Sequence, residues 1–369
     1  MIKLGVIFGG MSTEHDVSIV SGTAVIQNLD KSKYDITAIY IDLNGDWYLY
    51  NKKAEEIEMA KLGEHLTDLE KIENPFKVLK EMDKVFPVLH GLYGEDGTIQ
   101  GMLEMLKIPY VGCGVLASSV CMDKVYTKII LEKANINQAE YVYIKKPGYN
   151  YIYVDSQFNE FDISIEEIAK KTVEKLGLPV FVKPSNSGSS VGIKKAKTTE
   201  ELVEAIKYAG EFDRKILVEK EVIAREIECA VLGIENPEAS CVGEIMPAEE
   251  FYSYDAKYNN TESLVKIPAQ IDEEISEEIR KIAIKAYKAV DAKGLARVDF
   301  FVEKGTNKIY LNEINTMPGF TSISMYPQLW AKCGKPYGEL LDELVNGDGS
   351  FWQEICNWGR VNLADFLQN

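Results

Sequence analysis

Short apolar runs bounded by glycine and polar residues recur in the first third of the chain. The segments KLGVIFG, YDITAIYID and KVFPVLHG have the length and composition of buried strands. A helix is expected to begin near Ser12 or Thr13, because Glu14 and Asp16 then lie where a helix N-terminus favours acids. Strands that alternate with helices predict a parallel sheet with helices on both faces, which here forms an α/β domain ending near residue 125.

The pattern changes in the rest of the chain. Residues 123–176 are mostly helical or irregular in pattern, whereas PVFVKP, KILVEKEV and REIECAVLGI have the pattern of strands. Amphipathic periodicity predicts helices over Thr198–Ala209 and Ile271–Ala292, and GLARVDFFVEKGTNKIYLNEIN predicts a β-hairpin. The polar and aromatic segment 247–263 has no period and is too long for a simple turn, which indicates a functional loop.

The predicted hairpin brings polar residues together on one face. If Asp299 lies opposite Glu313, a regular antiparallel register puts Arg297 opposite Asn315 and leaves a loop of three or five residues around Gly305–Asn307. Residues two apart on a strand point the same way, so all four side chains share a face. Two carboxylates and an amide oxygen suit Mg²⁺ held together with substrate phosphates. The alternative is a solvated face with an Arg–Asp pair.

Two glycine-rich segments are candidates for ligand binding. In VKPSNSGSSVGI, a strand that ends at Lys183 runs into small residues whose backbone N–H groups can approach phosphate oxygens. No Walker A pattern is present there, and a flexible surface loop is the alternative. In HGLYGEDGTIQG, His90, Glu95 and Asp96 follow a strand, where open α/β sheets bind ligands. A structural histidine is the alternative for His90.

Two helical segments carry charged candidates. GGMSTEHDVS lacks the full GxGxxG spacing of a dinucleotide site, and a carboxylate at Glu14 suits a substrate ammonium better than a pyrophosphate. Helix capping is the alternative for this residue. MDKVYTK places Lys124 and Lys128 one turn apart, a spacing that is typical of a solvated lysine face.

Composition narrows the class of protein. A chain of 369 residues suits two or three domains, and its net charge of −17 disfavours binding to nucleic acid and to anionic membranes. Six cysteines without CxxC spacing and only three histidines argue against zinc and suit a reducing cytoplasm. The N-terminus lacks the apolar region of a signal peptide, and no apolar run is long enough to span a membrane.

Taken together, the motifs resemble the D-alanine–D-alanine ligases of the ATP-grasp superfamily over roughly residues 1–345. The segments FGGMSTEHDVSIVSG, HGLYGEDGTIQGMLEMLKIPYVG, SSVCMDKVYTK, VKPSNSGSSVGI and LNEINTMPGFTSISMYP occur in the family's order. The resemblance implies an N-terminal α/β substrate-binding domain at 1–125, followed by ATP-grasp domains at 126–220 and 221–345. ATP would lie between their antiparallel sheets, under the mobile loop 247–263. The tail 346–369 departs from the family, and we assign it no role.

The resemblance also implies roles for single residues. The positions that match ATP contacts are Lys128, Lys183, Ser190, Glu219, Val222, Glu226, Lys257 and Asn312. The positions that match ligands of Mg²⁺ or Mn²⁺, expected as two ions, are Asp299, Glu313 and Asn315. The first D-alanine is expected near Glu14, Val17 and His90, and the second near Ser324 and Met325. Catalytic roles fall to Glu14, to Ser189 and Tyr258, which link it to the mobile loop, and to Arg297 and the Gly319 N–H as oxyanion stabilisers.

The implied reaction makes D-alanyl-D-alanine for peptidoglycan precursors through a D-alanyl phosphate. Related ligases form D-alanyl-D-lactate or D-alanyl-D-serine. Tyr258 argues for an amine nucleophile, because a histidine is expected there in the lactate-forming members. D-serine stays open as second substrate, since pockets discriminate weakly against an added hydroxyl. The family suggests a homodimer, and a non-catalytic ATP-binding sensor is the alternative of a different class.

Overall fold

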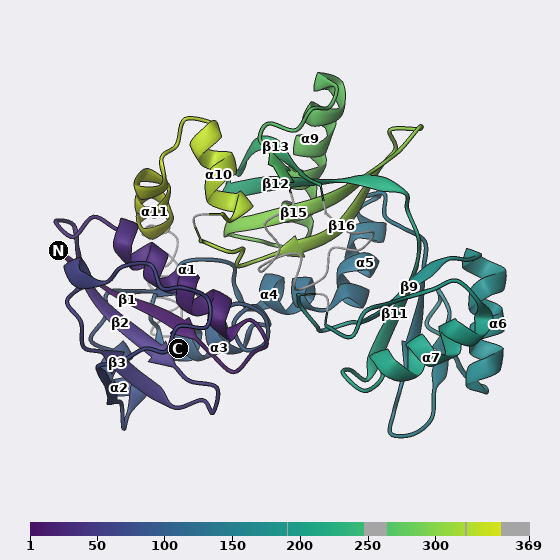
Figure 1. The fold of residues 1–369 in the computed structure, drawn as a ribbon, viewed down its shortest axis with the longest axis horizontal. Coiled ribbons are helices and arrows are strands. Elements are labelled where there is room, and N and C mark those ends of the chain that lie inside the picture. Colours follow the sequence, from purple (N-terminus) through teal and green to yellow (C-terminus); the bar gives the residue numbers. More distant parts are fainter. Residues whose placement is uncertain (190, 247–263, 322, 348–369) are drawn as a thin grey trace, which may run out of the picture.

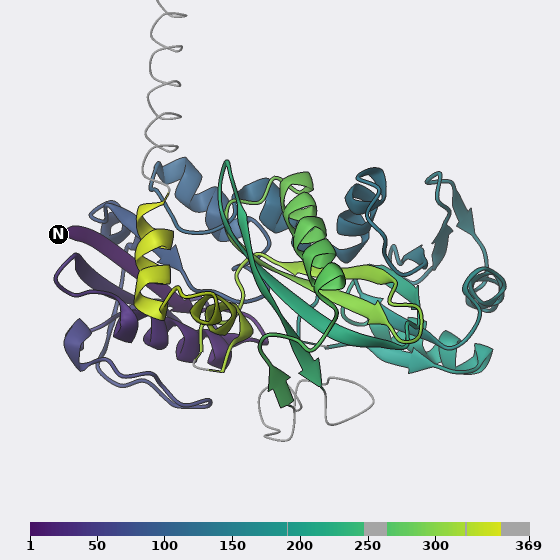
Figure 2. The same cartoon turned by 90° about the horizontal axis from the view of Figure 1, so that it is seen from above.

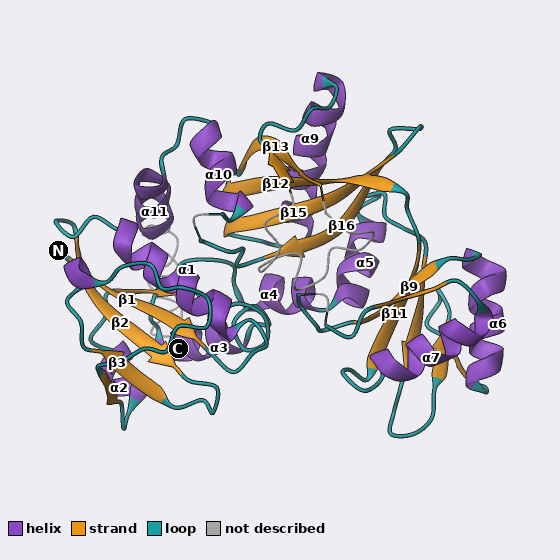
Figure 3. Ribbon diagram, in the orientation of Figure 1, coloured by secondary structure: helices purple, strands orange, loops and turns teal. Residues whose placement is uncertain are grey.

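A computed structural model of the chain describes residues 1–189, 191–246, 264–321 and 323–347, and it contains three sheets. Figures 1 and 2 show that the sheet formed last in the sequence lies between the other two. Helices pack beside each sheet (Figure 3). Among the described residues, no helix is long and apolar enough to cross a membrane.

The first sheet has the predicted parallel strands and adds an antiparallel edge that the sequence did not indicate. Its order is β4-β3-β2-β1-β5, with β1 parallel to β2 and β5 and with an antiparallel edge formed by β3 and β4. The strands are β1 (Ile2–Gly9), β2 (Tyr34–Ile41), β3 (Trp47–Tyr50), β4 (Leu69–Lys71) and β5 (Lys84–Pro87). The helical segments are α1 (His15–Asn28), η1 (Ala54–Glu56), α2 (Pro75–Leu79), α3 (Thr98–Leu106) and α4 (Val115–Met122).

Helix α1 begins later than predicted, at His15, with Glu14 in the N-cap position. Ser12 explains why the helix starts later. Its hydroxyl donates to the His90 carbonyl at 2.7 Å and accepts the Glu14 N–H at 3.1 Å. Residues before the helix are therefore used to attach it to the loop after β5. Glu14 is held at the junction between turn and helix.

The second sheet is antiparallel throughout, in the order β10-β9-β11-β6-β7-β8. Its strands are β6 (Tyr141–Lys145), β7 (Ile152–Val154), β8 (Glu160–Asp162), β9 (Val180–Pro184), β10 (Lys194–Ala196) and β11 (Lys215–Lys220). The helices near it are α5 (Lys124–Lys133), α6 (Ile165–Leu176) and α7 (Thr199–Ala209). Residues 123–176 were expected to be mostly helical or irregular, and the strands β6, β7 and β8 within them were missed. The predicted strand at PVFVKP and the helix α7 are confirmed.

The third sheet is also antiparallel, in the order β14-β13-β12-β15-β16. Its strands are β12 (Ala224–Gly233), β13 (Glu238–Met246), β14 (Leu264–Lys266), β15 (Gly294–Glu303) and β16 (Ile309–Asn315). Its helices are α9 (Glu273–Ala289), α10 (Met325–Lys332) and α11 (Tyr337–Asn346). Helix α9 packs against β12, β13 and β15, which confirms the amphipathic prediction.

The hairpin of β15 and β16 has the predicted register only at the end nearer the site. Asp299 lies opposite Glu313 and Arg297 opposite Asn315, but the register then shifts, so that Asn312 is an extra residue. This bulge lets Asn312 and Glu313 line the same cavity, where a regular strand would turn one of them away. The shift also changes the turn: the Glu303 N–H donates to the Lys308 carbonyl across residues 304–307, instead of a loop of three or five residues.

The first and third sheets share one hydrophobic core. Phe8 of β1 belongs to the same buried cluster as Leu295 of β15 and Leu340 of α11, whereas the second sheet has a separate core with α6 and α7. Polar contacts reinforce the shared region, since the Lys84 ammonium donates to the Val345 carbonyl at 2.6 Å. Asp342 of α11 accepts hydrogen bonds from Lys33 and Tyr34 as well.

Candidate active site

A cavity of about 1170 Å³ lies where the three sheets approach one another. Its wall includes Glu14 from the first sheet's side, Lys183 and Glu219 from the second, and Asp299 and Glu313 from the third. Residues from all parts of the fold therefore meet at one site. A large cavity on which polar groups from several elements converge is typical of a small-molecule site.

The hairpin supplies an acidic cluster with an arginine in it. Arg297 donates to both carboxylate oxygens of Asp299, at 2.8 and 2.7 Å, and its Nε lies 3.0 Å from Glu228 of β12. The Asn315 amide donates to Asp299 at 2.9 Å. Burial alone would lower the pKa of Arg297, but Asp299 and Glu228 hold it well above the usual value. Arg297 therefore remains a fixed positive charge at the cavity wall.

The same cluster offers oxygen ligands for a divalent cation. The Asp299 and Glu313 carboxylates and the Asn315 amide carry the hard oxygen donors that Mg²⁺ prefers, and all three line the cavity. Among the residues that the structure describes, no three or more His, Cys, Asp or Glu side chains are grouped so that they could hold a metal ion. The donor set therefore fits a cation that takes its remaining ligands from a bound phosphate, as Mg²⁺ does in nucleotide sites.

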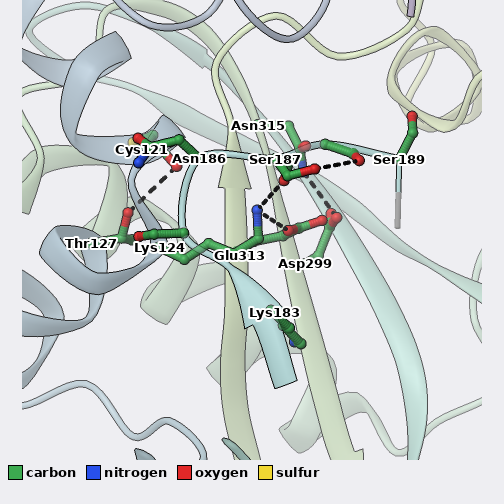
Figure 4. Close-up of polar contacts among 12 residues, drawn as sticks. Cys121, Lys124, Thr127, Lys183, Asn186, Ser187, Ser189, Asp299, Glu313 and Asn315 are labelled. Carbon is green, nitrogen blue, oxygen red and sulfur yellow. Dashed lines mark hydrogen bonds and ion pairs between the residues drawn. The ribbon is translucent and has the colours of Figure 1, made fainter. Parts of the chain in front are cut away.

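The lysines of α5 do not form the solvated face that their spacing alone indicates, because Lys124 is partly buried and Lys128 is buried. Figure 4 shows Lys124 between Ser187 and Glu313, with its ammonium 2.6 Å from the Ser187 carbonyl and 3.9 Å from the Glu313 carboxylate. Lys128 is 3% exposed. The start of α5 is fixed by Asp123, whose carboxylate accepts the N–H groups of Val125 and Tyr126. This cap directs both lysines toward the interior.

A lysine–glutamate–lysine group forms the second sheet's side of the cavity. The Glu219 carboxylate of β11 lies 2.6 Å from the Lys128 ammonium and 2.5 Å from that of Lys183 on β9. Burial would raise the pKa of Glu219, but the two lysines lower it to about 2. Burial lowers the pKa of Lys128. Burial also opposes the charge of Lys183, but the charge and hydrogen bond of Glu219, with the charges of Glu313 and Glu226, together raise its pKa. Lys183 lines the cavity, and Lys128 lies behind it, against Glu219.

The first sheet contributes a carboxylate at the start of α1. The Ser189 hydroxyl donates to Glu14 at 2.5 Å and so joins the helix start to the Gly/Ser loop after β9. The fit is tight, because a Cβ at Gly188 would lie 2.6 Å from a Glu14 oxygen. Ser189 has a positive φ of 47°, which few non-glycine residues adopt. Glu14 is thus held where it can face a cationic group in the cavity.

His90 lines the cavity near Glu14, but its ring nitrogens already have protein partners. Nδ1 lies 2.9 Å from the Met317 carbonyl and Nε2 lies 2.9 Å from the Ser21 hydroxyl. The carbonyl can only accept, so Nδ1 carries the proton and Nε2 accepts from Ser21. Burial lowers the pKa of His90, which favours this neutral ring. The structural role that the sequence left open for His90 is therefore present.

The turn after β16 forms the remaining wall, with Gly319, Ser324 and Met325 at the cavity. The Ser324 hydroxyl accepts the Thr321 N–H at 3.0 Å and sits 2.7 Å from where a Cβ of Gly319 would be. A side chain at Gly319 would therefore collide with the group that closes the turn. The backbone of Gly319 stays open to the cavity.

The structure brings together nearly all the candidate residues that it describes. Those at the cavity wall are Glu14, Val17, His90, Lys183, Ser189, Glu219, Val222, Glu226, Arg297, Asp299, Asn312, Glu313, Asn315, Gly319, Ser324 and Met325. Ser190, Lys257 and Tyr258 lie outside the described residues. Four acids at the wall were given no individual role from the sequence: Glu95, Glu221, Glu228 and Glu244. Glu95 belongs to the same motif as His90, whereas Glu228 needs the pairing of β12 with β15 to be found.

Comparison with known proteins gives consistent relatives. Family models described as the D-ala D-ala ligase N-terminus and C-terminus match residues 3–113 and 130–346. The D-alanine–D-alanine ligase of Clostridium acetobutylicum is 52% identical, and the match covers 93% of this chain and 96% of the relative. The D-alanine–D-alanine ligase of Acetivibrio thermocellus is 49% identical, and the match covers 92% of this chain and 94% of the relative.

Solved structures agree with these relatives. The D-alanine–D-alanine ligase from Coxiella burnetii is 35% identical with a TM-score of 0.84, over 99% of this chain and 98% of that chain. The VanG D-Ala:D-Ser ligase from Enterococcus faecalis is 38% identical with a TM-score of 0.79, and the match covers 93% of this chain and 98% of that chain. The site geometry and these likenesses lead to one conclusion: the chain belongs to the D-alanine–D-alanine ligase family.

Proposed function

We propose that this protein joins two D-alanine molecules into D-alanyl-D-alanine at the expense of ATP, for peptidoglycan precursor synthesis. One observation carries the proposal. A single cavity holds an ammonium-binding candidate (Glu14), a phosphate-binding candidate (Lys183) and an acidic cluster with Arg297. The reaction needs these three kinds of group, because it combines an amino acid, a nucleoside triphosphate and a charged transition state.

ATP is assigned to the space between the second and third sheets. Lys183 and Lys124 lie where they can contact phosphate oxygens, and Val222 and Glu226 lie at the same wall for the adenosine. Asp299, Glu313 and Asn315 would hold Mg²⁺ or Mn²⁺, as one or two ions. When bound, the cation neutralises phosphate charge.

In the first step, a carboxylate oxygen of the first D-alanine attacks the γ-phosphorus of ATP. A new O–P bond forms, the bond to the bridging oxygen breaks, and ADP leaves, so that a D-alanyl phosphate results. Glu14 would hold the ammonium of this D-alanine, with Ser189 fixing the carboxylate in place. The protein's part is positioning, since holding reactants in line converts an encounter into a step within one complex.

In the second step, the free amine of the second D-alanine attacks the acyl carbon. The new C–N bond creates an oxyanion, which collapses as phosphate leaves and the nitrogen loses a proton. Arg297 and the Gly319 N–H are the proposed oxyanion stabilisers, with Ser324 and Met325 beside the second substrate. Lys257 and Tyr258 of loop 247–263 are assigned to closure over the site, because an acyl phosphate must be kept from water.

Two alternatives from the sequence are weighed against the same site. The D-Ala:D-Ser ligase relative keeps D-serine open as second substrate, although the 52% and 49% identical relatives are D-alanine–D-alanine ligases. A non-catalytic sensor would be expected to lack part of the machinery, yet Arg297, Asp299, Glu313, Asn315 and Gly319 all meet at the cavity. A cytoplasmic location and a homodimer stay proposals drawn from composition and family.

The test is incubation of the folded protein with ATP, Mg²⁺ and D-alanine, with release of phosphate and formation of dipeptide measured together. We expect phosphate release that requires D-alanine and equals the dipeptide formed. Folded protein that binds ATP but releases no D-alanine-dependent phosphate would contradict the proposal. Competition between D-alanine and D-serine, with the products identified by mass, assigns the second substrate.

A further inference from the structure

The segment 316–320, which leads to the proposed oxyanion donor, belongs to no helix or strand. Side chains from the first sheet's half of the molecule hold it instead. The Met317 N–H donates to Glu95 at 2.9 Å, and the Met317 carbonyl accepts from His90 Nδ1 at 2.9 Å. The N–H and the carbonyl of Met317, two positions before Gly319, are thus both bound by the loop after β5.

The residue after Gly319 is also held by the first sheet's half of the molecule. The Phe320 N–H donates to the Ser21 hydroxyl at 3.2 Å, and this hydroxyl is the partner of His90 Nε2. Glu95 is itself fixed, because its second oxygen accepts the Gly91 N–H at 2.9 Å. Gly319 therefore lies between two backbone positions that Glu95, His90 and Ser21 hold in place.

Glu95 is the charged member of this arrangement. It lines the cavity, where the charged or titratable groups around it include Glu14, His90, Arg297 and the Cys121 thiol. Burial and then the Glu14 charge raise the pKa of Glu95 to about 7, against the Gly91 and Met317 N–H groups, which lower it. The ionised carboxylate accepts both N–H groups, whereas protonation converts one oxygen into a donor.

We propose that Glu95 is a positioning residue for the second chemical step: with His90, it holds Met317 so that the Gly319 N–H faces the forming oxyanion. This inference rests on the proposed function, which assigns that step. Glu95 is assigned no contact with substrate or phosphate, and it acts through the backbone of residues 317–319. A small displacement of an oxyanion donor is costly, because such donors act only over hydrogen-bond distance.

The test compares Glu95→Gln, Glu95→Asp and the control Glu104→Gln. The glutamine amide has one accepting oxygen, so one of the two N–H groups then faces another donor. Aspartate keeps both acceptors on a shorter side chain. Glu104 lies on α3 near Glu95 in sequence, accepts a hydrogen bond from Tyr110 and is absent from the cavity wall.

For Glu95→Gln we expect kcat for dipeptide to fall roughly 30-fold, within the range for a displaced catalytic group. The KM for ATP should change little. Phosphate release should fall less than dipeptide formation, because acyl phosphate that is not captured hydrolyses. Glu95→Asp should recover part of kcat and of the ratio of dipeptide to phosphate. In wild type that ratio should fall as the pH drops below about 7, while Glu95→Gln should give a flatter profile.

Hydrogen–deuterium exchange provides a readout that does not depend on the reaction. Glu95→Gln should speed exchange in a peptide covering residues 314–321 and leave the melting temperature close to that of Glu104→Gln. Unchanged exchange there, or an unchanged dipeptide-to-phosphate ratio, would overturn the inference. If wild type formed no dipeptide while the exchange effect persisted, the proposed function would fail and the positioning of the segment would stand.

Discussion

Removal of the Glu219 charge gives a sharp test of how the second sheet's side of the site is held together. The Glu219 side chain is 6% exposed and lies between those of Lys128, 3% exposed, and Lys183, 14% exposed. Glu219→Gln would leave two buried ammonium groups without their shared counter-charge. We expect the second sheet to lose stability, since an unpaired buried charge is among the most destabilising features a variant can create.

The magnitude follows from the protonation of Glu219. Its pKa falls from 4.5 to about 2 on folding, and each pH unit corresponds to about 1.4 kcal/mol, so the charge contributes roughly 3 kcal/mol. Breaking a buried ion pair by removing one partner costs about 3–5 kcal/mol in other proteins, which agrees. Because the folded pKa is the lower one, this contribution is complete above about pH 4.5 and is lost as the pH falls toward 2.

The assay must report on the second sheet itself. None of the four tryptophans lies in residues 126–220, so tryptophan fluorescence would miss the effect. Hydrogen–deuterium exchange of peptides from β9 and β11 measures the local free energy of opening directly. The control is Glu221→Gln, because Glu221 pairs with one lysine, Lys195, at 2.7 Å and is 20% exposed. It should cost less than about 1 kcal/mol.

Two results would contradict this stabilising effect of the Glu219 charge. The first is a cost for Glu219→Gln no larger than that for Glu221→Gln at pH 7. The second is a difference from wild type that stays constant between pH 6 and pH 3, since the carboxylate's contribution should begin to shrink in that interval. A parallel measurement of ATP affinity should show weaker binding for Glu219→Gln, because Lys183 would no longer be held against β11.

Three further predictions concern the rest of the cavity. Gly188→Ala places a Cβ 2.6 Å from a Glu14 oxygen, so we expect KM for D-alanine to rise about tenfold with the fold retained, as steady-state kinetics and calorimetry would show; an unchanged KM would contradict the contact. Glu313→Gln removes an anionic metal ligand and should lower kcat about 100-fold while raising the Mg²⁺ concentration needed, and near-normal turnover would count against the assignment. Deletion of Asn312 should give a regular ladder that keeps Asp299 opposite Glu313, so the melting temperature should change little while ATP binding weakens; unfolding of the variant would refute this account of the bulge.

The sequence was sufficient for elements whose pattern is local. The helices over Thr199–Ala209 and Glu273–Ala289 have clear amphipathic periods, and Thr198 caps the first. Strand β6 was missed although Tyr141–Lys145 alternates aromatic and β-branched residues. The strand pairs with β7 close by in sequence, but its other partner, β11, lies some seventy residues later, and pairing over that distance leaves no local signal.

The site was predicted best where one hairpin determines it. The opposition of Asp299 and Glu313 follows from strand geometry alone. The bulge at Asn312 was missed, although Leu311 and Ile314, three apart and both buried, break the alternation of a regular strand. Glu95 has its role only through Met317, which lies 222 residues further along the chain. Contacts of that range depend on how whole sheets pack, and no spacing in the sequence encodes them.

The hydrophobic core shared by the first and third sheets has a mechanical consequence. In chain order the molecule has three parts, but in its packing it has two bodies, because Phe8 and Leu295 lie in one cluster and the second sheet has its own. Within the residues that the structure describes, the chain passes between these bodies at two places: at α5, which packs against both, and between β11 and β12. Motion at these two crossings would carry Lys183 and Glu219 away as a unit, while Glu14, Glu95 and Gly319 keep their spacing. Nucleotide exchange could then proceed without rebuilding the half of the site that receives the amino acids.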